Sequence, residues 1–230
     1  DGTKALFAEY GTRIQGFYSF DIYTPLCCSS AVGSYRYKIT CKTPGGHSYA
    51  NFGDPSAIQL LCGLVNELYQ IQPPVRSRTT YNVGRIEGGT TVNSIAQQAS
   101  MLYEFRSDKR ENLEYMERQF MEVLDRAKAE GTDVSFQVIG VRPCEGQVDP
   151  AQKQALTDWA HRVVEEMTGQ APKHHAGSTD CNIPLSLGIP SVCVGSFRGA
   201  GAHTREEYVE TDSLEEGYKV AFGMIFGRRD

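Results

Sequence analysis

The strongest constraint on the fold of this 230-residue chain is a change of hydrophobic period that recurs through its middle. From residue 34 the apolar side chains alternate, with Tyr35, Tyr37 and Ile39 on one side of the chain and Arg36 and Lys38 on the other. This period of two predicts a strand in a sheet that has one face in water. The pattern then switches to helical spacing, and the two periods continue to follow one another until residue 141.

The order of these periods predicts a small two-layer domain. Asp54 is expected to be the N-cap of the first helix, with Pro55 in its first turn. The inward positions of that helix are Ile58, Leu61, Cys62, Val65, Leu68 and Tyr69. The other expected elements are strands near residues 79–86, 97–105 and 134–141 and a second helix near residues 109–129. The order β-α-β-β-α-β is typical of a split-βαβ sandwich, in which two helices cover one face of an antiparallel sheet.

The segments on both sides of this block have the pattern of a second, α/β domain. Residues 14–21 form a short apolar run that ends in Asp21, and residues 189–194 form another, as buried strands do. The simplest architecture is an α/β domain interrupted by an inserted ferredoxin-like domain. The expected boundaries are 1–33 and 144–230 for the α/β domain and 34–143 for the insertion.

Composition excludes several classes of protein. A net charge of −5 provides no basic surface for nucleic acid. No apolar run approaches the roughly 18 residues that a membrane span needs, and the first residues lack the order of a secretory signal. The seven cysteines have neither zinc-ribbon spacing nor the density of a disulfide scaffold, so we expect free and mostly buried thiols. These features predict a cytoplasmic protein with no nucleic-acid or membrane partner.

Glycine-rich loops hold polar residues that packing does not require. His47 follows two glycines, and a histidine on such a turn can donate to an oxyanion, although most loop histidines are surface or capping residues. Asn93 lies in a glycine-led loop and suits a carboxylate or a carbonyl, or else an ordinary hairpin connection. Arg106 ends a strand and suits bidentate carboxylate recognition, or else a surface ion pair with Asp108.

Two further residues are candidates for metal binding. Asp21 ends its strand, and His203 lies on a glycine-rich loop beyond the strand at residues 191–194. Both are expected at the carboxyl edge of the sheet, where open α/β folds place their ligands. Aspartate and histidine are common zinc ligands, but two donors alone specify neither the metal nor its affinity.

Six segments occur in an order that is typical of one family: SFD, AVGSYRYKITCKTPGGHS, GGTTVNSI, YEFRSD, GSTDCN and GAGAHTREEYV. Over nearly its entire length the chain resembles the dinuclear-zinc metallopeptidases. These include tripeptide aminopeptidases, glutamate carboxypeptidases, aminoacylases, acetylornithine deacetylase and succinyl-diaminopimelate desuccinylase. The resemblance implies zinc-dependent hydrolysis of peptide or N-acyl amide bonds and a homodimer formed through the inserted domain.

The resemblance also implies roles for individual residues. Asp21 and His203 correspond to ligands of two different zinc ions, and Glu207 corresponds to an acid that supports the metal histidine. His47 corresponds to the histidine that reaches into the partner's active site and stabilises the oxyanion. The positions that correspond to substrate-binding or pocket-lining residues are Asn93, Arg106, Thr179, Asp180, Gly199 and Gly201.

Part of the family's machinery has no counterpart in this sequence, namely the His-x-Asp motif, the metal-bridging aspartate and the Glu-Glu pair that includes the general base. We therefore expect a C-terminal piece that binds zinc weakly and is inactive alone. The alternative is a non-catalytic dimerisation or binding module of the same fold. A small regulatory ligand-binding sandwich would explain residues 34–141 but would leave the loop around His203 without a purpose.

Overall fold

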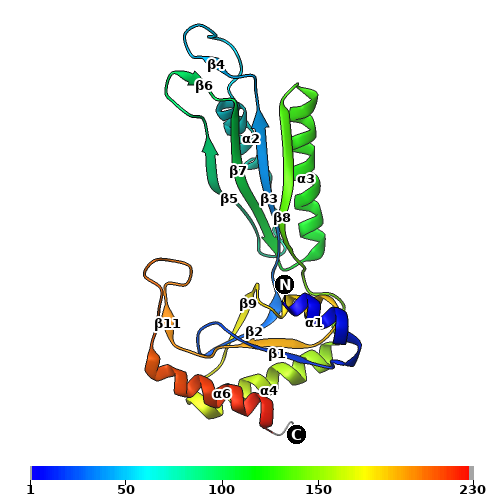
Figure 1. Ribbon diagram of the computed structural model, residues 1–230. Helices are drawn as coiled ribbons and strands as arrows, with labels where there is room; N and C mark the ends of the chain where they lie inside the picture. Colours follow the sequence, from blue (N-terminus) through cyan, green and yellow to red (C-terminus); the bar gives the residue numbers. More distant parts are fainter. Residues whose placement is uncertain (1, 228–230) are drawn as a thin grey trace. The chain divides into compact units, whose positions relative to one another are not determined.

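A computed structural model describes residues 2–227 of the chain. They form two compact units (Figure 1). Unit 1 comprises the described residues up to Val32 together with those from Arg142 onward, and unit 2 comprises Gly33–Val141. The chain therefore leaves unit 1, builds unit 2 and returns.

Unit 2 consists of one four-stranded sheet and two helices. The strands are β3 (Gly33–Lys42), β5 (Thr79–Gly88), β7 (Gln98–Ser107) and β8 (Asp133–Arg142), in the spatial order β5-β7-β3-β8. The helices are α2 (Ala57–Leu68) and α3 (Arg110–Ala129), and both pack against β3 and β7. The predicted order β-α-β-β-α-β is confirmed. Two short strands, β4 (Gly46–His47) and β6 (Ser94–Ile95), pair outside the main sheet.

The core of unit 2 follows from the alternation seen in the sequence. Tyr37, Ile39 and Cys41 on β3 are buried, as are Met101, Tyr103 and Phe105 on β7. The ring centroids of Tyr37 and Phe120 of α3 lie 4.5 Å apart, so aromatic packing joins the helix layer to the sheet. Charged side chains of the other face, such as Lys38, remain exposed.

The predicted start of the first helix is wrong. The helix begins at Ala57 with Ser56 at the N-cap, whereas the N–H of Asp54 donates to Asn51 O within the preceding turn. The buried stripe is correspondingly rotated and consists of Ala57, Leu61, Leu64 and Leu68. The expected inward residues Ile58, Cys62 and Tyr69 are exposed. Local spacing was compatible with either stripe, and packing against the sheet selects one.

Unit 1 is built on a second four-stranded sheet with the order β1-β10-β2-β9. Its strands are β1 (Phe17–Phe20), β2 (Leu26–Ala31), β9 (Lys173–Gly177) and β10 (Ser191–Val194). β1 runs parallel to β10, β10 runs antiparallel to β2, and β2 runs parallel to β9. The predicted α/β class is confirmed.

Helices complete unit 1. They are α1 (Gly2–Tyr10), α4 (Pro150–Thr168), α5 (Asn182–Ser186) and α6 (Leu214–Phe226), with short 3₁₀ turns at Gly11–Arg13 and Thr211–Ser213. Asp149 caps α4 by accepting a hydrogen bond from the N–H of Gln152 at 2.9 Å. Trp159 and Val163 of α4 pack with Val192 of β10 and Val220 of α6 in one core cluster. No helix in residues 2–227 is both long and apolar enough for a membrane span.

The seven cysteines, all within the described residues, form no disulfide bonds, as the sequence predicted. Six of them are buried, and only Cys62 on α2 is exposed. Burial raises the pKa of the Cys41 thiol to about 11 and that of the Cys193 thiol to about 12. The buried cysteines therefore behave as small apolar side chains.

Candidate active site

Asp21 lies directly beyond the carboxyl end of β1 and is exposed. Its N–H donates to Val194 O at 3.2 Å, which continues the β1–β10 pairing by one residue. Its carboxylate accepts a hydrogen bond from the N–H of Ile22 at 2.8 Å. Ile22 has a φ of 60°, an uncommon value for a β-branched residue, so the chain turns sharply after the acid. The turn leaves the carboxylate at the sheet edge.

His203 lies in the loop of a small hairpin formed by β11 (Gly199–Ala200) and β12 (Tyr208–Val209). Its φ is 67°, and its N–H donates to the Glu207 carboxylate at 3.2 Å. Glu207 therefore contacts the backbone of the histidine rather than its ring. The sequence-predicted Gly199 and Gly201 have backbone reasons to be glycine. A Cβ on Gly199 would lie 2.3 Å from Tyr208 O, and Gly201 has a φ of +75°.

The structure brings Asp21 and the hairpin of His203 to the same edge of the sheet. Because β1 and β10 are parallel, both chains leave the sheet at their carboxyl ends on this edge. Beyond it, Tyr23 and Phe197 form one more parallel bridge, and their rings meet edge to face at 5.4 Å between centroids. An acid and a histidine thus extend from adjoining segments.

Thr179 and Asp180 follow the end of β9, at the other edge of the sheet, because β9 and β2 run opposite to β10. The N–H of Thr179 donates to Asn182 Oδ1 at 2.8 Å, and the amide of Asn182 donates to Val32 O and Pro143 O. Asn182 is almost fully buried. It joins the two ends of unit 1 between which unit 2 is inserted, a role that sequence reasoning missed.

His47 and Asn93 lie together at one end of unit 2. His47 pairs with Ser94, and the N–H of Ser48 donates to Asn93 O at 3.0 Å. A compact turn holds the histidine, since its own N–H donates to Asn51 Oδ1 at 3.0 Å. The β4–β6 pairing that makes them neighbours has no periodic signal in the sequence.

The hydrogen bonds of the His47 ring define its tautomer. The ring atom Nδ1 accepts from the N–H groups of Tyr49 and Ala50 at 3.2 and 3.4 Å. An accepting Nδ1 leaves the proton of the neutral ring on Nε2. The exposed ring therefore offers an N–H donor beyond the turn, which is the group that an oxyanion requires.

Arg106 does not join His47 and Asn93. It lies near the opposite end of β7, and the eight residue-to-residue steps from Gln98 to Arg106 span roughly 26 Å of strand. Glu104 binds the Nε and Nη2 atoms of Arg106 at 2.8 and 3.1 Å, and it also binds Arg36 at 3.1 Å. The ion pair expected with Asp108 is replaced by this pair with Glu104. The Nη1 group of Arg106 is not used in these bonds.

The described residues contain no cluster of three or more histidine, cysteine, aspartate or glutamate side chains suited to a metal ion. The carboxylate of Asp21 and the imidazole of His203 are the right donor types for zinc. Catalytic zinc sites use three protein ligands, so these two residues provide only part of a donor set.

Comparisons with known proteins agree with the fold described above. Residues 30–132 match the family model of the peptidase dimerisation domain. No curated protein sequence matches the chain. Among solved structures, aminopeptidase PepT from Bacillus cereus ATCC 10987 is similar over 97% of this chain and 60% of its own, with 23% identity and a TM-score of 0.71.

Two further structures have the same fold. A tripeptidase from Staphylococcus aureus subsp. aureus Mu50 is similar over 97% of this chain and 59% of its own, with 19% identity and a TM-score of 0.73. An aminobenzoyl-glutamate utilization protein from Klebsiella pneumoniae is similar over 95% and 56%, with 15% identity and a TM-score of 0.68. This chain therefore spans about 60% of the length of the two peptidases.

Proposed function

Because residues 30–132 match the family model of the peptidase dimerisation domain, we propose that this chain is the dimerising part and the C-terminal catalytic part of a zinc-dependent hydrolase of peptide or N-acyl amide bonds. The observation that carries the proposal is that Asp21 and the His203 hairpin both follow the carboxyl ends of the parallel strands β1 and β10, at the same edge of the sheet. The fold shared with an aminopeptidase and a tripeptidase supports it.

In this proposal Asp21 and His203 are ligands of two different zinc ions. When bound, the metal pair would activate a water and polarise the scissile carbonyl. The remaining ligands and the general base would come from a segment equivalent to the part of those peptidases that this chain does not cover. Glu207 supports His203 by holding its backbone N–H.

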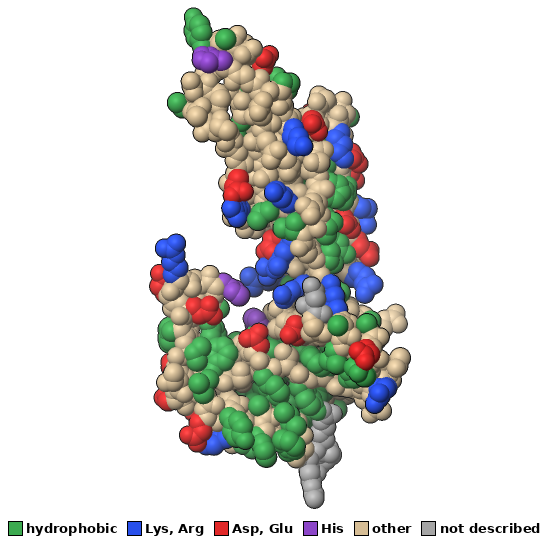
Figure 2. Space-filling view, in the orientation of Figure 1, with side chains coloured by type: hydrophobic (Ala, Val, Ile, Leu, Met, Phe, Trp, Pro, Cys, Tyr) green, Lys and Arg blue, Asp and Glu red, His purple; other side chains and the backbone are tan. Residues whose placement is uncertain are grey.

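The surface of α6 supports the idea that unit 1 belongs to a larger catalytic domain. Gly217, Val220 and Met224 of this helix are buried. The opposite side carries exposed apolar residues, namely Leu214, Tyr218, Phe222, Ile225 and Phe226. Figure 2 shows hydrophobic side chains gathered over the helices of unit 1. A helix that is apolar on both sides is typical of the inside of a larger domain.

Unit 2 would act as the lid and dimerisation domain. His47 would donate from Nε2 to the oxyanion in the partner's active site, and Asn93, its neighbour across the β4–β6 pairing, would bind the substrate carbonyl or carboxylate. Arg106 would bind a substrate carboxylate through the Nη1 group that Glu104 leaves unused. The glycines before His203 would line the same pocket, whereas Thr179 and Asp180, which follow β9 at the opposite edge of the sheet, would lie away from it.

Two further features belong to the proposal. The protein would be a homodimer that acts on small peptides or N-acyl amino acids and has no nucleic-acid or membrane partner. It would work in a reducing compartment such as the cytoplasm, which is supported by seven cysteines that form no disulfide bonds.

The test is an assay of the full-length protein against di- and tripeptides and N-acyl amino acids, with zinc, with a chelator and after zinc is restored. We expect hydrolysis that the chelator abolishes and zinc restores. His47→Ala should lower kcat about a hundredfold or more, because one oxyanion donor is lost. His174→Ala is the matched control, since it removes another exposed histidine and should leave kcat unchanged.

The competing function is a non-catalytic dimerisation or binding module of the same fold. A full-length protein that is dimeric and zinc-loaded but turns over no substrate of the panel would favour it. Full activity of a folded His47→Ala variant would show that His47 does not stabilise the oxyanion.

A further inference from the structure

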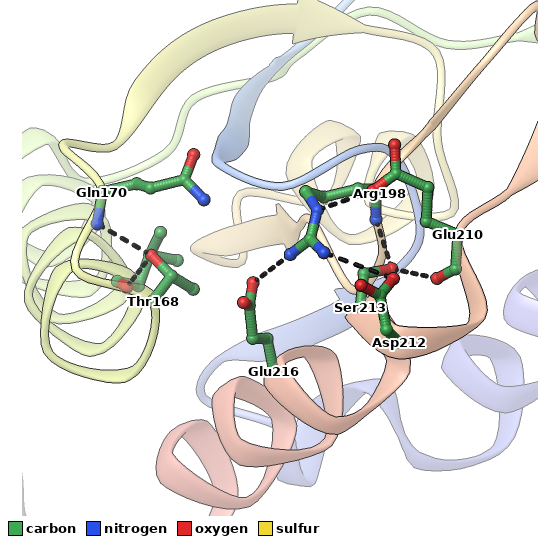
Figure 3. A network of polar contacts seen from close by, with 8 residues as sticks. Thr168, Gln170, Arg198, Glu210, Asp212, Ser213 and Glu216 are labelled. Carbon is green, nitrogen blue, oxygen red and sulfur yellow. Dashed lines mark hydrogen bonds and ion pairs between the residues drawn. The ribbon is translucent and has the colours of Figure 1, made fainter.

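We propose that Arg198 is a positioning residue, which binds the His203 hairpin to helix α6 and thereby determines the position of His203. The inference rests on the proposed function in so far as His203 is taken to be a metal ligand. The fastening itself rests on contacts within unit 1 (Figure 3).

The side chain of Arg198 contacts three carboxylates. Its Nε lies 2.9 Å from Glu210, its Nη1 lies 2.8 Å from Glu216 and its Nη2 lies 3.4 Å from Asp212. Glu210 directly follows β12, Asp212 lies in the 3₁₀ turn, and Glu216 lies in the first turn of α6. One guanidinium fork therefore joins the end of the hairpin to the helix.

The backbone of Arg198 makes the same connection. The N–H of Glu210 donates to Arg198 O at 2.9 Å, which closes the hairpin at its base. The N–H of Arg198 donates to Ser213 Oγ at 2.8 Å, and this hydroxyl donates to Glu210 O at 2.5 Å. Ser213 is buried at the start of α6. Backbone and side chain of one residue thus bind both the hairpin base and the helix.

The hairpin beyond this base depends on it for its position. β11 and β12 form a two-stranded sheet of their own, separate from the main sheet of unit 1. Residues 201–210 are all exposed, and the loop is shaped by internal bonds such as Thr204 N–H to Gly201 O at 2.9 Å. Such bonds fix the shape of the loop but not its orientation. A metal ligand must be held to a fraction of an ångström, so the orientation has to come from the base.

Only the fork geometry of arginine satisfies this arrangement. Lysine would keep the positive charge but has a single ammonium group, which cannot reach three carboxylates on three segments. Charge balance and positioning therefore make different predictions for Arg198→Lys. If the charge is what matters, lysine restores the wild-type behaviour, and if the fork matters, it does not.

The test compares Arg198→Met and Arg198→Lys with Lys219→Met, which breaks the exposed pair of Lys219 with Glu215 on the same helix. In this chain, the backbone amides of residues 199–209 should exchange hydrogen at least tenfold faster in both Arg198 variants than in the wild type. The strands of unit 2 and the control variant should keep wild-type rates. In the full-length protein, cobalt titration followed by its visible spectrum should show about ten- to hundredfold weaker binding in both Arg198 variants.

The outcomes separate this inference from the proposed function. Wild-type exchange of the hairpin in Arg198→Met, equal acceleration throughout unit 1, or full rescue by lysine would overturn the positioning role. A loosened hairpin with unchanged cobalt binding would uphold the positioning role and show that His203 is not a ligand. Should Arg198→Met fail to fold, Glu210→Gln removes one arm of the fork and is expected to loosen the same segment.

Discussion

Ser196 and Gly217 are in such close contact that a Cβ on Gly217 would lie 1.7 Å from the carbonyl oxygen of Ser196. Gly217 lies in α6, and Ser196 lies between β10 and the hairpin that carries His203. The glycine therefore lets the helix approach the base of the hairpin more closely than any other residue would.

Gly217→Ala should destabilise the protein by about 1–3 kcal/mol or more, because backbone rather than a flexible side chain opposes the added methyl group. Gly63→Ala is the matched control, since Gly63 lies in α2 and a Cβ added there would meet no atom within 4 Å. That variant should be more stable by about 0.5–1 kcal/mol. Urea unfolding measures the change in free energy of unfolding for each variant. Equal changes of the same sign would contradict the close contact between Gly217 and Ser196.

The proposed homodimer is predicted to form along β8 of unit 2. This strand is one edge of its sheet, and it exposes the apolar side chains of Phe136, Val138, Ile139 and Val141. An exposed apolar edge strand favours pairing with another chain. Val138→Lys combined with Ile139→Lys should convert the dimer to a monomer in light scattering. Thr80→Lys on the opposite edge strand, β5, should leave the dimer intact, and the reverse result would place the interface at β5.

Glu104 should make stability depend on pH. Burial opposes its ionisation, but Arg106 and Arg36 outweigh burial and hold the pKa of Glu104 below its ordinary value. The stabilisation is therefore present above the unfolded-state pKa of about 4.3 and is lost as pH falls through the lower folded-state pKa. Glu104→Gln should be less stable than wild type at pH 7. Urea unfolding should show that the difference in free energy of unfolding between the two proteins becomes smaller below about pH 4. Glu114→Gln, on the exposed side of α3, should show no such narrowing.

Thiol labelling should detect one cysteine in the native protein. Cys62 is exposed, whereas the other six are buried, and burial raises the pKa of Cys27 to about 12. A thiol-specific reagent at pH 8 should react quickly with a single group and with all seven after unfolding. Cys62→Ser should abolish the fast reaction. Rapid labelling of two or more groups in the folded protein would contradict the packing of the β2 and β10 cysteines.

Under the proposal that this chain is part of a longer hydrolase, the apolar side of α6 should behave differently in this chain and in the longer protein. Tyr218 and Phe222 are 68% and 52% exposed here, so replacing both with Gln should reduce self-association with little change in thermal stability. In the full-length protein the same replacement should destabilise by about 2–5 kcal/mol, because burial of two large aromatic side chains is lost. Differential scanning calorimetry of both lengths tests this. An equal effect in both would mean that nothing covers the helix.

Local patterns in the sequence were sufficient to predict several helices and strands. Alternation around Tyr37 predicted β3, and helical spacing from Leu113 to Leu124 predicted α3 to within one residue at its start. Side chains on one face of a strand or helix pack against the same core, so the period of apolar residues along the sequence predicts which side chains are buried. For the same reason the order of elements, and with it the split-βαβ fold, was readable before any contact was known.

Which polar residues contact one another could not be predicted from the sequence and follows from the folded arrangement of distant segments. Asn182 binds Val32 across 150 positions of sequence, and Arg198 meets Glu216 through a hairpin and a turn, so neither contact has a local pattern. The tautomer of His47 likewise follows from two backbone N–H groups that only the folded turn directs at its ring. A hydrogen bond requires a donor and an acceptor within about 3 Å of each other, and no periodicity of residue types specifies such a distance between distant segments.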